Sequence, residues 1–412
     1  MTTTETEFGW RTVGASVLLP TLLFSIGQGA IIPIIPVIAH DLGAGLAGAG
    51  LIAAMLIVGE LVGDIPAGAL IARIGERVGM LGASALGSAG VGVALLATTP
   101  WVLGLAVFLI GIATAVFALA RHAFMTSYVP PAYRARAMST LGGTFRLGYL
   151  IGPFLSAALI SATGEGSSAF WVQLAGCVAA AGVLLVLRDP ESSLAARTPS
   201  GELRAGELEV QAEARGLFAT IWASRRVLAT IGAGASLLAA LRASRQVLLP
   251  LWGVSLGLAE TRIAVIIGVA GLIDFALFYT GGWIMDRFGR LWVVVPCLTG
   301  LGIGHLVLAF THDLPGAVAW FIGVAAFLSL SNGIGAGILM TIGADLADPA
   351  DPAPFLGAWR FTNDSGSALA PLIIAGVTAI ASLPVAAAVL GVLSFVGAGL
   401  LRVHLPRHPA RD

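Results

Sequence analysis

The sequence of 412 residues has few charged residues, only two cysteines and no lysine. Charged residues make up 11% of the chain and hydrophobic residues 57%, whereas a soluble globular protein has about 45–50% apolar residues. These shares exclude an ordinary soluble protein. The formal net charge is zero, so no basic or acidic surface predicts a nucleic acid or another strongly charged partner.

Cysteines and catalytic residue patterns are equally scarce. Cys177 and Cys297 both lie within apolar runs, where a cysteine behaves as a small hydrophobic residue. The sequence therefore provides no disulfide or metal framework, and it contains no spacing typical of a Ser/His/Asp site. We expect that the protein is not an enzyme and that it uses no metal or cofactor.

Long apolar runs dominate the sequence, and the mean hydropathy is +0.94. A membrane-spanning helix needs about 20 mostly apolar residues, and twelve runs meet this length. They lie near residues 14–39, 45–69, 79–97, 101–123, 138–161, 168–187, 228–253, 261–285, 292–310, 316–342, 355–378 and 382–402. The expected fold class is an all-α integral membrane protein with twelve transmembrane helices.

One long polar segment, residues 188–227, divides the twelve runs into six and six. We expect two six-helix bundles, residues 1–187 and 228–412, joined by a linker over 188–227. The end of this linker, residues 216–222, is either a short helix at the membrane surface or plain linker. In the orientation with a cytoplasmic N-terminus, nearly all loop arginines are cytoplasmic, as the positive-inside rule requires. Both termini are then cytoplasmic, and the protein lies in a bacterial inner membrane.

The two halves repeat each other with an offset of 214 positions. The segment from Gly68 to Arg77 corresponds to the segment from Gly282 to Arg290, with Gly68 on Gly282. The same offset places Glu60 on Asp274 and Gln28 on Arg242. The halves are therefore expected to be pseudo-symmetric.

Several polar and charged residues lie inside the predicted helices. A charge at the membrane centre costs at least about 2.5–3.5 kcal/mol, so each such residue is a candidate for function. The candidates for proton coupling are Glu60, Asp64, Asp274 and Asp364; the candidates for substrate binding are Gln28, Arg146, Arg242, Arg245, Trp252 and Asn332. The alternative is that the charges form internal ion pairs that only fix helix packing, and for Arg121, Arg360 and Asp64 this alternative is favoured.

The charged segment between the eighth and ninth helices carries a family resemblance. Its residues Gly282, Asp286, Arg287, Gly289 and Arg290 follow the signature loop of the major facilitator superfamily, and Gly68, Arg73, Gly75 and Arg77 lie where that loop recurs between helices two and three. The resemblance implies a transporter of two six-helix bundles with a gating loop in each half. In the first loop, Ala72 stands where the family has Asp. In the family this acid helps to hold the two halves together on the cytoplasmic side, a contact called the latch here. The resemblance therefore implies that the latch is stronger at the second loop. Asp64 or Glu76 is expected to replace the missing acid by pairing with Arg146 or Arg360.

Two further segments are similar to the drug:proton antiporter branch of this family. They are residues 29–36 of the first helix and the fifth-helix segment with Gly148, Gly152 and Pro153. The arginine that many antiporters have in helix four is replaced by Val107. Together these segments favour a proton-coupled exporter. Its expected substrates are small amphipathic or anionic molecules, because the arginines inside the predicted helices are well suited to carboxylate and phosphate.

The alternatives are an uptake symporter for an organic anion or sugar, and a membrane sensor or scaffold that transports nothing. For a transporter, the expected partners are the lipid bilayer, a small-molecule substrate and protons. A monomer is expected.

Overall fold

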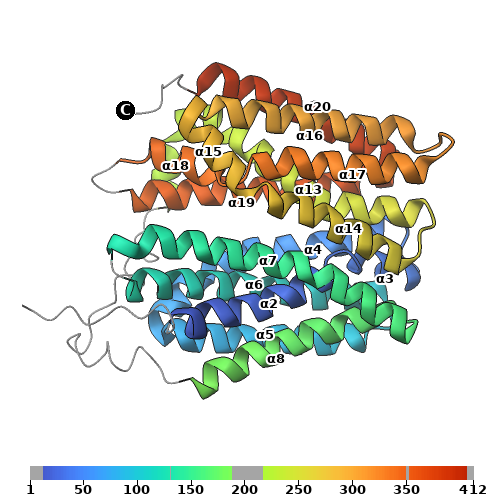
Figure 1. Ribbon diagram of the computed structural model, residues 1–412, viewed down its shortest axis with the longest axis horizontal. Coiled ribbons are helices and arrows are strands. Elements are labelled where there is room, and N and C mark those ends of the chain that lie inside the picture. The colour runs from blue at the N-terminus through green and yellow to red at the C-terminus, as the bar shows by residue number, and fades with distance from the viewer. Residues whose placement is uncertain (1–12, 130, 188–216, 349–351, 406–412) are drawn as a thin grey trace, which may run out of the picture.

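The computed structural model describes residues 13–129, 131–187, 217–348 and 352–405. Its helices form two bundles that lie one above the other, each built from consecutive parts of the chain (Figure 1). Most of the predicted linker, residues 188–216, lies outside the described residues. The following residues form a short helix, α11 (Leu217–Ala223), which packs against the second bundle.

The first bundle contains seven α-helices in the described residues, α2 to α8. They are α2 (Leu19–Ile31), α3 (Ile35–Asp41), α4 (Leu46–Ile74), α5 (Glu76–Leu95), α6 (Pro100–Tyr128), α7 (Pro131–Thr163) and α8 (Ala169–Val186). A π-helical turn, η1 (Gly14–Leu18), precedes α2, and a short 3-10 helix, η2 (Gly166–Ser168), precedes α8.

The second bundle follows the short helices α11 and α12 (Arg225–Val227) and the π-helical turn η3 (Leu228–Gly232). It comprises α13 (Ala233–Ser255), α14 (Glu260–Ala276), α15 (Phe278–Phe288), α16 (Leu291–Thr311), α17 (Ala317–Ile334), α18 (Ile338–Leu346), α19 (Ala353–Ile380) and α20 (Leu383–His404).

Eleven segments among the described residues are long and apolar enough to cross a membrane. The remaining predicted span, the eleventh by position, is the 28-residue helix α19, which carries the polar residues Arg360, Asn363 and Asp364 near its middle. It packs between α13 and α4, where side chains of both bundles can meet these polar groups. The expected all-helical membrane fold is therefore confirmed.

The backbone repeats with the offset found in the sequence. The π-helical turns η1 and η3 begin at Gly14 and Leu228, 214 positions apart. Glycines with positive φ recur at the same spacing, with Gly43 (96°) matching Gly257 (68°) and Gly75 (81°) matching Gly289 (93°). A residue with a side chain is strained at such φ values, so all four turns require glycine.

Three predicted spans are interrupted, which the apolar pattern did not reveal. The first breaks at residues 32–34 between α2 and α3, the eighth at Leu277 between α14 and α15, and the tenth at residues 335–337 between α17 and α18. Pro33 and the positive φ of Gly337 account for two of them. Nothing in the sequence around Leu277 explains the third.

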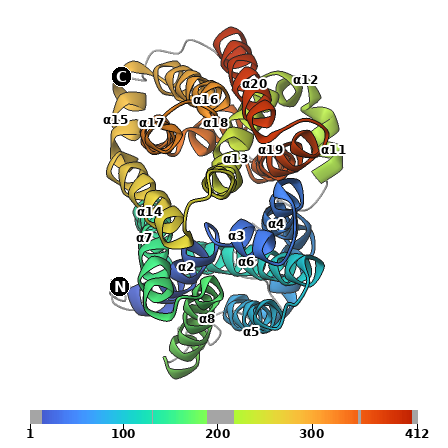
Figure 2. The same ribbon diagram turned by 90° about the vertical axis from the view of Figure 1, so that its right-hand side faces the viewer.

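The described contacts between the bundles gather at the end of the molecule away from the linker. There Leu251 packs against Gly50 and Ala375, Phe154 lies against Gly268, and Ile34 packs with Ala264. Figure 2 shows α3, α4 and α7 facing α13, α14 and α19 across this boundary.

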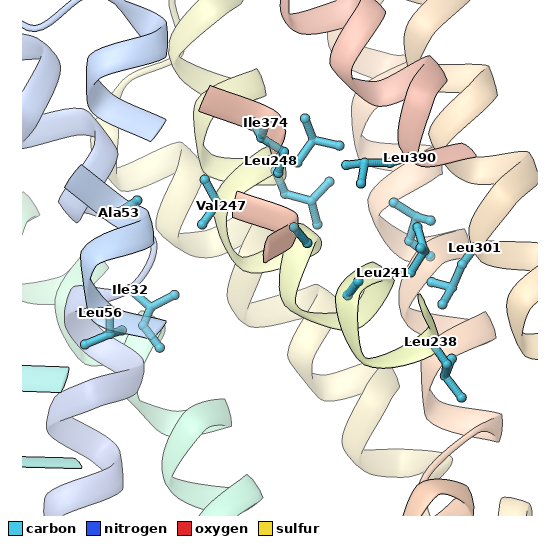
Figure 3. Close-up of a cluster of buried hydrophobic side chains, with 14 of the residues drawn as sticks. Ile32, Ala53, Leu56, Leu238, Leu241, Val247, Leu248, Leu301, Ile374 and Leu390 are labelled. Atoms are coloured by element: carbon cyan, nitrogen blue, oxygen red, sulfur yellow. The ribbon is translucent and has the colours of Figure 1, made fainter. Parts of the chain in front are cut away.

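Many of the side chains at this boundary are apolar, although Gln246 and the pair Asp41 and Glu260 also lie there. Ile32, Ala53 and Leu56 of the first bundle and Val247 of the second line one small cavity, and all belong to a continuous buried cluster (Figure 3). The two bundles are closed against each other at this end; in the predicted orientation with cytoplasmic termini, it would be the extracytoplasmic end.

Candidate functional site

The centre of the second bundle contains an ion pair in which both oxygens of Asp274 accept hydrogen bonds, while Nε of Arg245 has no hydrogen-bond partner. Arg245 on α13 donates from Nη2 to Oδ2 of Asp274 on α14 at 3.0 Å, and also to Oγ of Ser329 at 2.6 Å. Asn332 on α17 donates to the other oxygen, Oδ1, of Asp274 at 2.9 Å. Each carboxylate oxygen therefore has a donor, and the pair is electrically neutral.

One turn earlier on α13, Arg242 has no such acid. It donates to the carbonyl of Gly335 at the break between α17 and α18, and its Nε has no hydrogen-bond partner. Within the described part of the chain, no carboxylate oxygen lies within 4.0 Å of Arg242. Its positive charge is consequently not neutralised by an adjacent acid.

Arg146 of the first bundle approaches this group from α7. Its guanidinium lies over the ring of Phe278 at 4.6 Å and interacts electrostatically with Arg242 and Asp274. The predicted residues Arg242, Arg245, Asp274 and Asn332 thus come together in the second bundle, and Arg146 of the first bundle approaches them. Two arginines here, Arg146 and Arg242, lack an acid partner among the described residues.

A second polar group lies in the first bundle. Gln28 is fully buried, donates to Thr114 on α6 and accepts from the hydroxyl of Tyr149 on α7 at 3.0 Å. Beside it, Arg121 lies over the ring of Phe145 at 4.7 Å. Gln28 thus belongs to a different group from Arg242, although the offset makes them equivalent.

Three acidic residues gather where α4 meets α19. Glu60 interacts electrostatically with Asp64 on its own helix and with Asp364 on α19. Arg360 attracts Asp64 and Asp364 electrostatically, and Arg121 attracts Glu60 in the same way. The candidates for proton coupling are therefore split, with Asp274 in the ion pair and the other three at this boundary.

One predicted residue lies elsewhere, and three residues were missed. Trp252 is 1% exposed and packs edge-on against His312, so it is not brought to either group. Phe145 and Tyr149 gave no signal in the sequence. Arg121 gave one, as a charge within an apolar helix, but its cytoplasmic position favoured a role in packing.

Comparison with known proteins agrees with this arrangement of helices. Residues 17–371 and 231–412 match the sequence model of the Major Facilitator Superfamily. The chain belongs to the major facilitator superfamily. It is therefore a secondary transporter, and the expectation that it is not an enzyme is confirmed.

Transporters with known structures share the fold at low sequence identity. A POT family transporter in complex with a thioalcohol-conjugated peptide superposes with a TM-score of 0.75 at 14% identity, over 95% of this chain and 96% of the other. A D-xylose-proton symporter superposes with a TM-score of 0.72 at 14% identity, over 98% of this chain and 100% of the other.

One curated relative is similar in sequence over part of its length. The bacillibactin exporter of Bacillus subtilis (strain 168) is 27% identical over 128 residues, which is 30% of this chain and 32% of the relative. The match spans about a third of that protein.

The two superfamily loops differ in what their arginines contact. Arg77 donates to the carbonyls of Leu184 and Leu187 at the end of α8, which ties the first loop to its own bundle. Arg290 donates to both oxygens of Asp345 on α18, from Nε at 2.8 Å. Of the remaining loop residues, Gly68 and Gly289 are buried, Gly75 and Gly282 are partly buried, and Arg73, Asp286 and Arg287 are exposed.

The latch itself stays a prediction. Asp286 is exposed and, among the described residues, has no ion pair. Asp64 interacts electrostatically with Arg360, one of the two proposed partners, while Arg146 lies beside Asp274 instead. Glu76 accepts a hydrogen bond from Ser127 at 2.8 Å within the first bundle.

The fifth-helix segment brings α7 into backbone contact with α2. A methyl group at Gly152 would overlap backbone atoms of Ile26 and Ala30, and one at Gly148 would overlap Ser25. Pro153 lies inside α7. The glycines are thus required for close packing of helices one and five.

Proposed function

We propose that the protein is a proton-coupled exporter of small amphipathic organic anions that works by alternating access. The observation that carries this proposal is the pair Arg146 and Arg242, one from each bundle, which interact with each other and have no carboxylate oxygen within 4.0 Å among the described residues. A guanidinium offers forked donors for carboxylate or phosphate. Phe278 beside Arg146 adds an aromatic surface for the apolar part of a substrate.

The proton is assigned to Glu60, Asp64 and Asp364. Three nearby carboxylates repel one another in a place of low water content, and a shared proton relieves this repulsion. Asp274 is a weaker candidate because Arg245 and Asn332 hold both its oxygens as hydrogen-bond acceptors. Glu60 is the central member, since it interacts with both other acids.

The moving units are proposed to be residues 1–187 and 228–412, with 188–227 as a cytoplasmic linker. Rocking of one half against the other around a midplane site is the general transporter design. Both termini would be cytoplasmic, and a monomer suffices because the site is formed within one chain. The fifth-helix glycines and the partial similarity to a bacillibactin exporter support export.

A second candidate is an uptake symporter for an organic anion. The observation that favours it is the electrostatic interaction of Arg121 with Glu60. An anion bound at Arg121 would offset its attraction for the ionised form of Glu60 and so favour a proton there. Anion and proton would then bind together, as symport requires.

Transport in proteoliposomes tests the proposal and separates the two candidates. Carboxyfluorescein, an amphipathic organic anion, is followed under pH gradients of either sign. Uptake driven by an acidic lumen supports exchange, and uptake driven by an acidic exterior supports symport. Glu60→Gln should abolish the response to pH, and Arg242→Ala should abolish saturable uptake. Wild-type behaviour of both variants would remove the proposed roles.

A further inference from the structure

Arg121 on α6 is a buried cation that the described protein leaves without an acid. Its residue is 7% exposed, and its Nε has no hydrogen-bond partner. No carboxylate oxygen lies within 4.0 Å of it in the described ranges, and Glu60 acts on it only over a longer distance. Its guanidinium lies over the ring of Phe145 at 4.7 Å.

Leaving a cation in this place is costly. A charge within the membrane normally pairs with another group or faces a cavity, and an uncompensated buried charge is strongly destabilising. Arg245 in the second bundle shows the alternative, because its Nη2 donates to an acid and to a hydroxyl. Arg121 therefore has donors for a group that the protein itself does not supply.

The surroundings of Arg121 are aromatic. Phe145 packs against Tyr149 with ring centroids 4.4 Å apart, and Gln28 accepts from the Tyr149 hydroxyl. Gln28 in turn donates to Thr114. The polar groups next to Arg121 are thus engaged with one another, and the guanidinium is the donor left for a ligand.

We propose that Arg121, Phe145 and Tyr149 form a second anion subsite, which binds a carboxylate carried on a flat or aromatic ring. The subsite lies in the first bundle, apart from Arg242 and Arg245, and it narrows the substrate class to aromatic acids. It rests on the proposed transport of organic anions and holds for either direction of transport. Arginine contributes both forked hydrogen bonds and stacking at such a site.

Binding to the purified full-length protein tests this assignment with three related probes. Benzoate carries a carboxylate on a flat ring, cyclohexanecarboxylate carries the same charge on a puckered ring, and benzyl alcohol is flat but neutral. Thermal unfolding as a function of probe concentration reports affinity. Benzoate should stabilise the wild type most, cyclohexanecarboxylate less, and benzyl alcohol not measurably.

The variants are Arg121→Gln and Arg121→Lys, with Arg402→Gln at an exposed position of α20 as the control. Loss of charge-assisted hydrogen bonds should weaken benzoate binding about tenfold or more in Arg121→Gln. Arg121→Lys should weaken benzoate binding less, and Arg402→Gln should leave benzoate binding unchanged. Without a probe, Arg121→Gln should melt no lower than the wild type, because it removes an unpaired buried charge.

The proposal is overturned if benzoate has no effect on the wild type, or if Arg121→Gln binds it as the wild type does. A lower melting temperature of the empty Arg121→Gln protein would also overturn it, since Arg121 would then be structural. Carboxyfluorescein transport is measured on the same preparations. Transport that persists while the benzoate effect is absent removes the subsite only, and loss of saturable wild-type transport removes the proposed function.

Discussion

Asp274 shows how the neighbours of an acidic residue in a membrane helix determine its role. Arg245 neutralises its charge, and Asn332 satisfies the second oxygen. Glu60, its equivalent in the first half, has acids as neighbours instead. The sequence predicts the position of both carboxyl groups, but the partners come from other helices and are not encoded in spacing along one helix.

Removal of Asp274 should therefore destabilise the protein. Asp274→Asn leaves Arg245 as an unpaired buried charge, which costs about 3–5 kcal/mol. Thermal unfolding in detergent measures the loss. The double variant Asp274→Asn with Arg245→Gln should regain much of it, because no charge remains unpaired. If Asp274→Asn unfolds as the wild type does, the pair contributes little, and Asp274 is free to act as a proton carrier.

The exposed pair in the second loop should behave differently. Arg290 and Asp345 have side chains that are 30% and 49% exposed. Pairs of this kind contribute about 0.2–1 kcal/mol, and salt screens them. Asp345→Asn should shift the melting temperature by at most a few degrees, less at high salt. A large loss that is insensitive to salt would show that Arg290 has a structural role in holding α18.

At the scale of elements, the apolar runs predict most helix positions but miss where helices break. Helix α4 continues through Gly63, whereas its equivalent breaks at Leu277 into α14 and α15. Both stretches are apolar, so hydropathy cannot distinguish them. What the structure adds is the packing at the break, where Gly281 of α15 lies against the backbone of Ile334, and Gly333 of α17 lies against Leu277 and Asp274.

The contact of α2 with α7 yields a matched pair of glycine substitutions. Gly152→Ala would force α7 away from Ile26 and Ala30, and overpacking costs about 1–3 kcal/mol or more. Gly142 lies on the same helix, and a methyl group added there would meet no other part of the molecule within 4 Å. Gly142→Ala should therefore be neutral or stabilising by about 0.4–1 kcal/mol. Thermal unfolding compares them, and equal effects would contradict the packing role of Gly152.

At the scale of the whole molecule, the two halves are held together at one end. Leu251 is fully buried there against Gly50 and Ala375, while Leu314, in the loop before α17, is 47% exposed. The two native cysteines are buried, so single introduced cysteines can be labelled selectively.

Labelling from outside the cell tests this closure. A membrane-impermeant maleimide should react with Leu314→Cys but not with Leu251→Cys in the resting protein. During transport, the opening of that end should raise the labelling rate of Leu251→Cys. Equal rates for the two positions at rest would contradict the closed extracytoplasmic end, and labelling of Leu314→Cys only after the cells are permeabilised would reverse the orientation.

The central claim is that the site between the halves accepts organic anions. Counterflow in proteoliposomes tests it most directly, because counterflow needs neither a proton gradient nor a known direction. The vesicles are loaded with carboxyfluorescein, and a trace of radiolabelled carboxyfluorescein is added outside. The radiolabel should accumulate transiently in wild-type vesicles and not in Arg242→Ala vesicles. Counterflow of the organic cation tetraphenylphosphonium without any counterflow of the anion would contradict the claim.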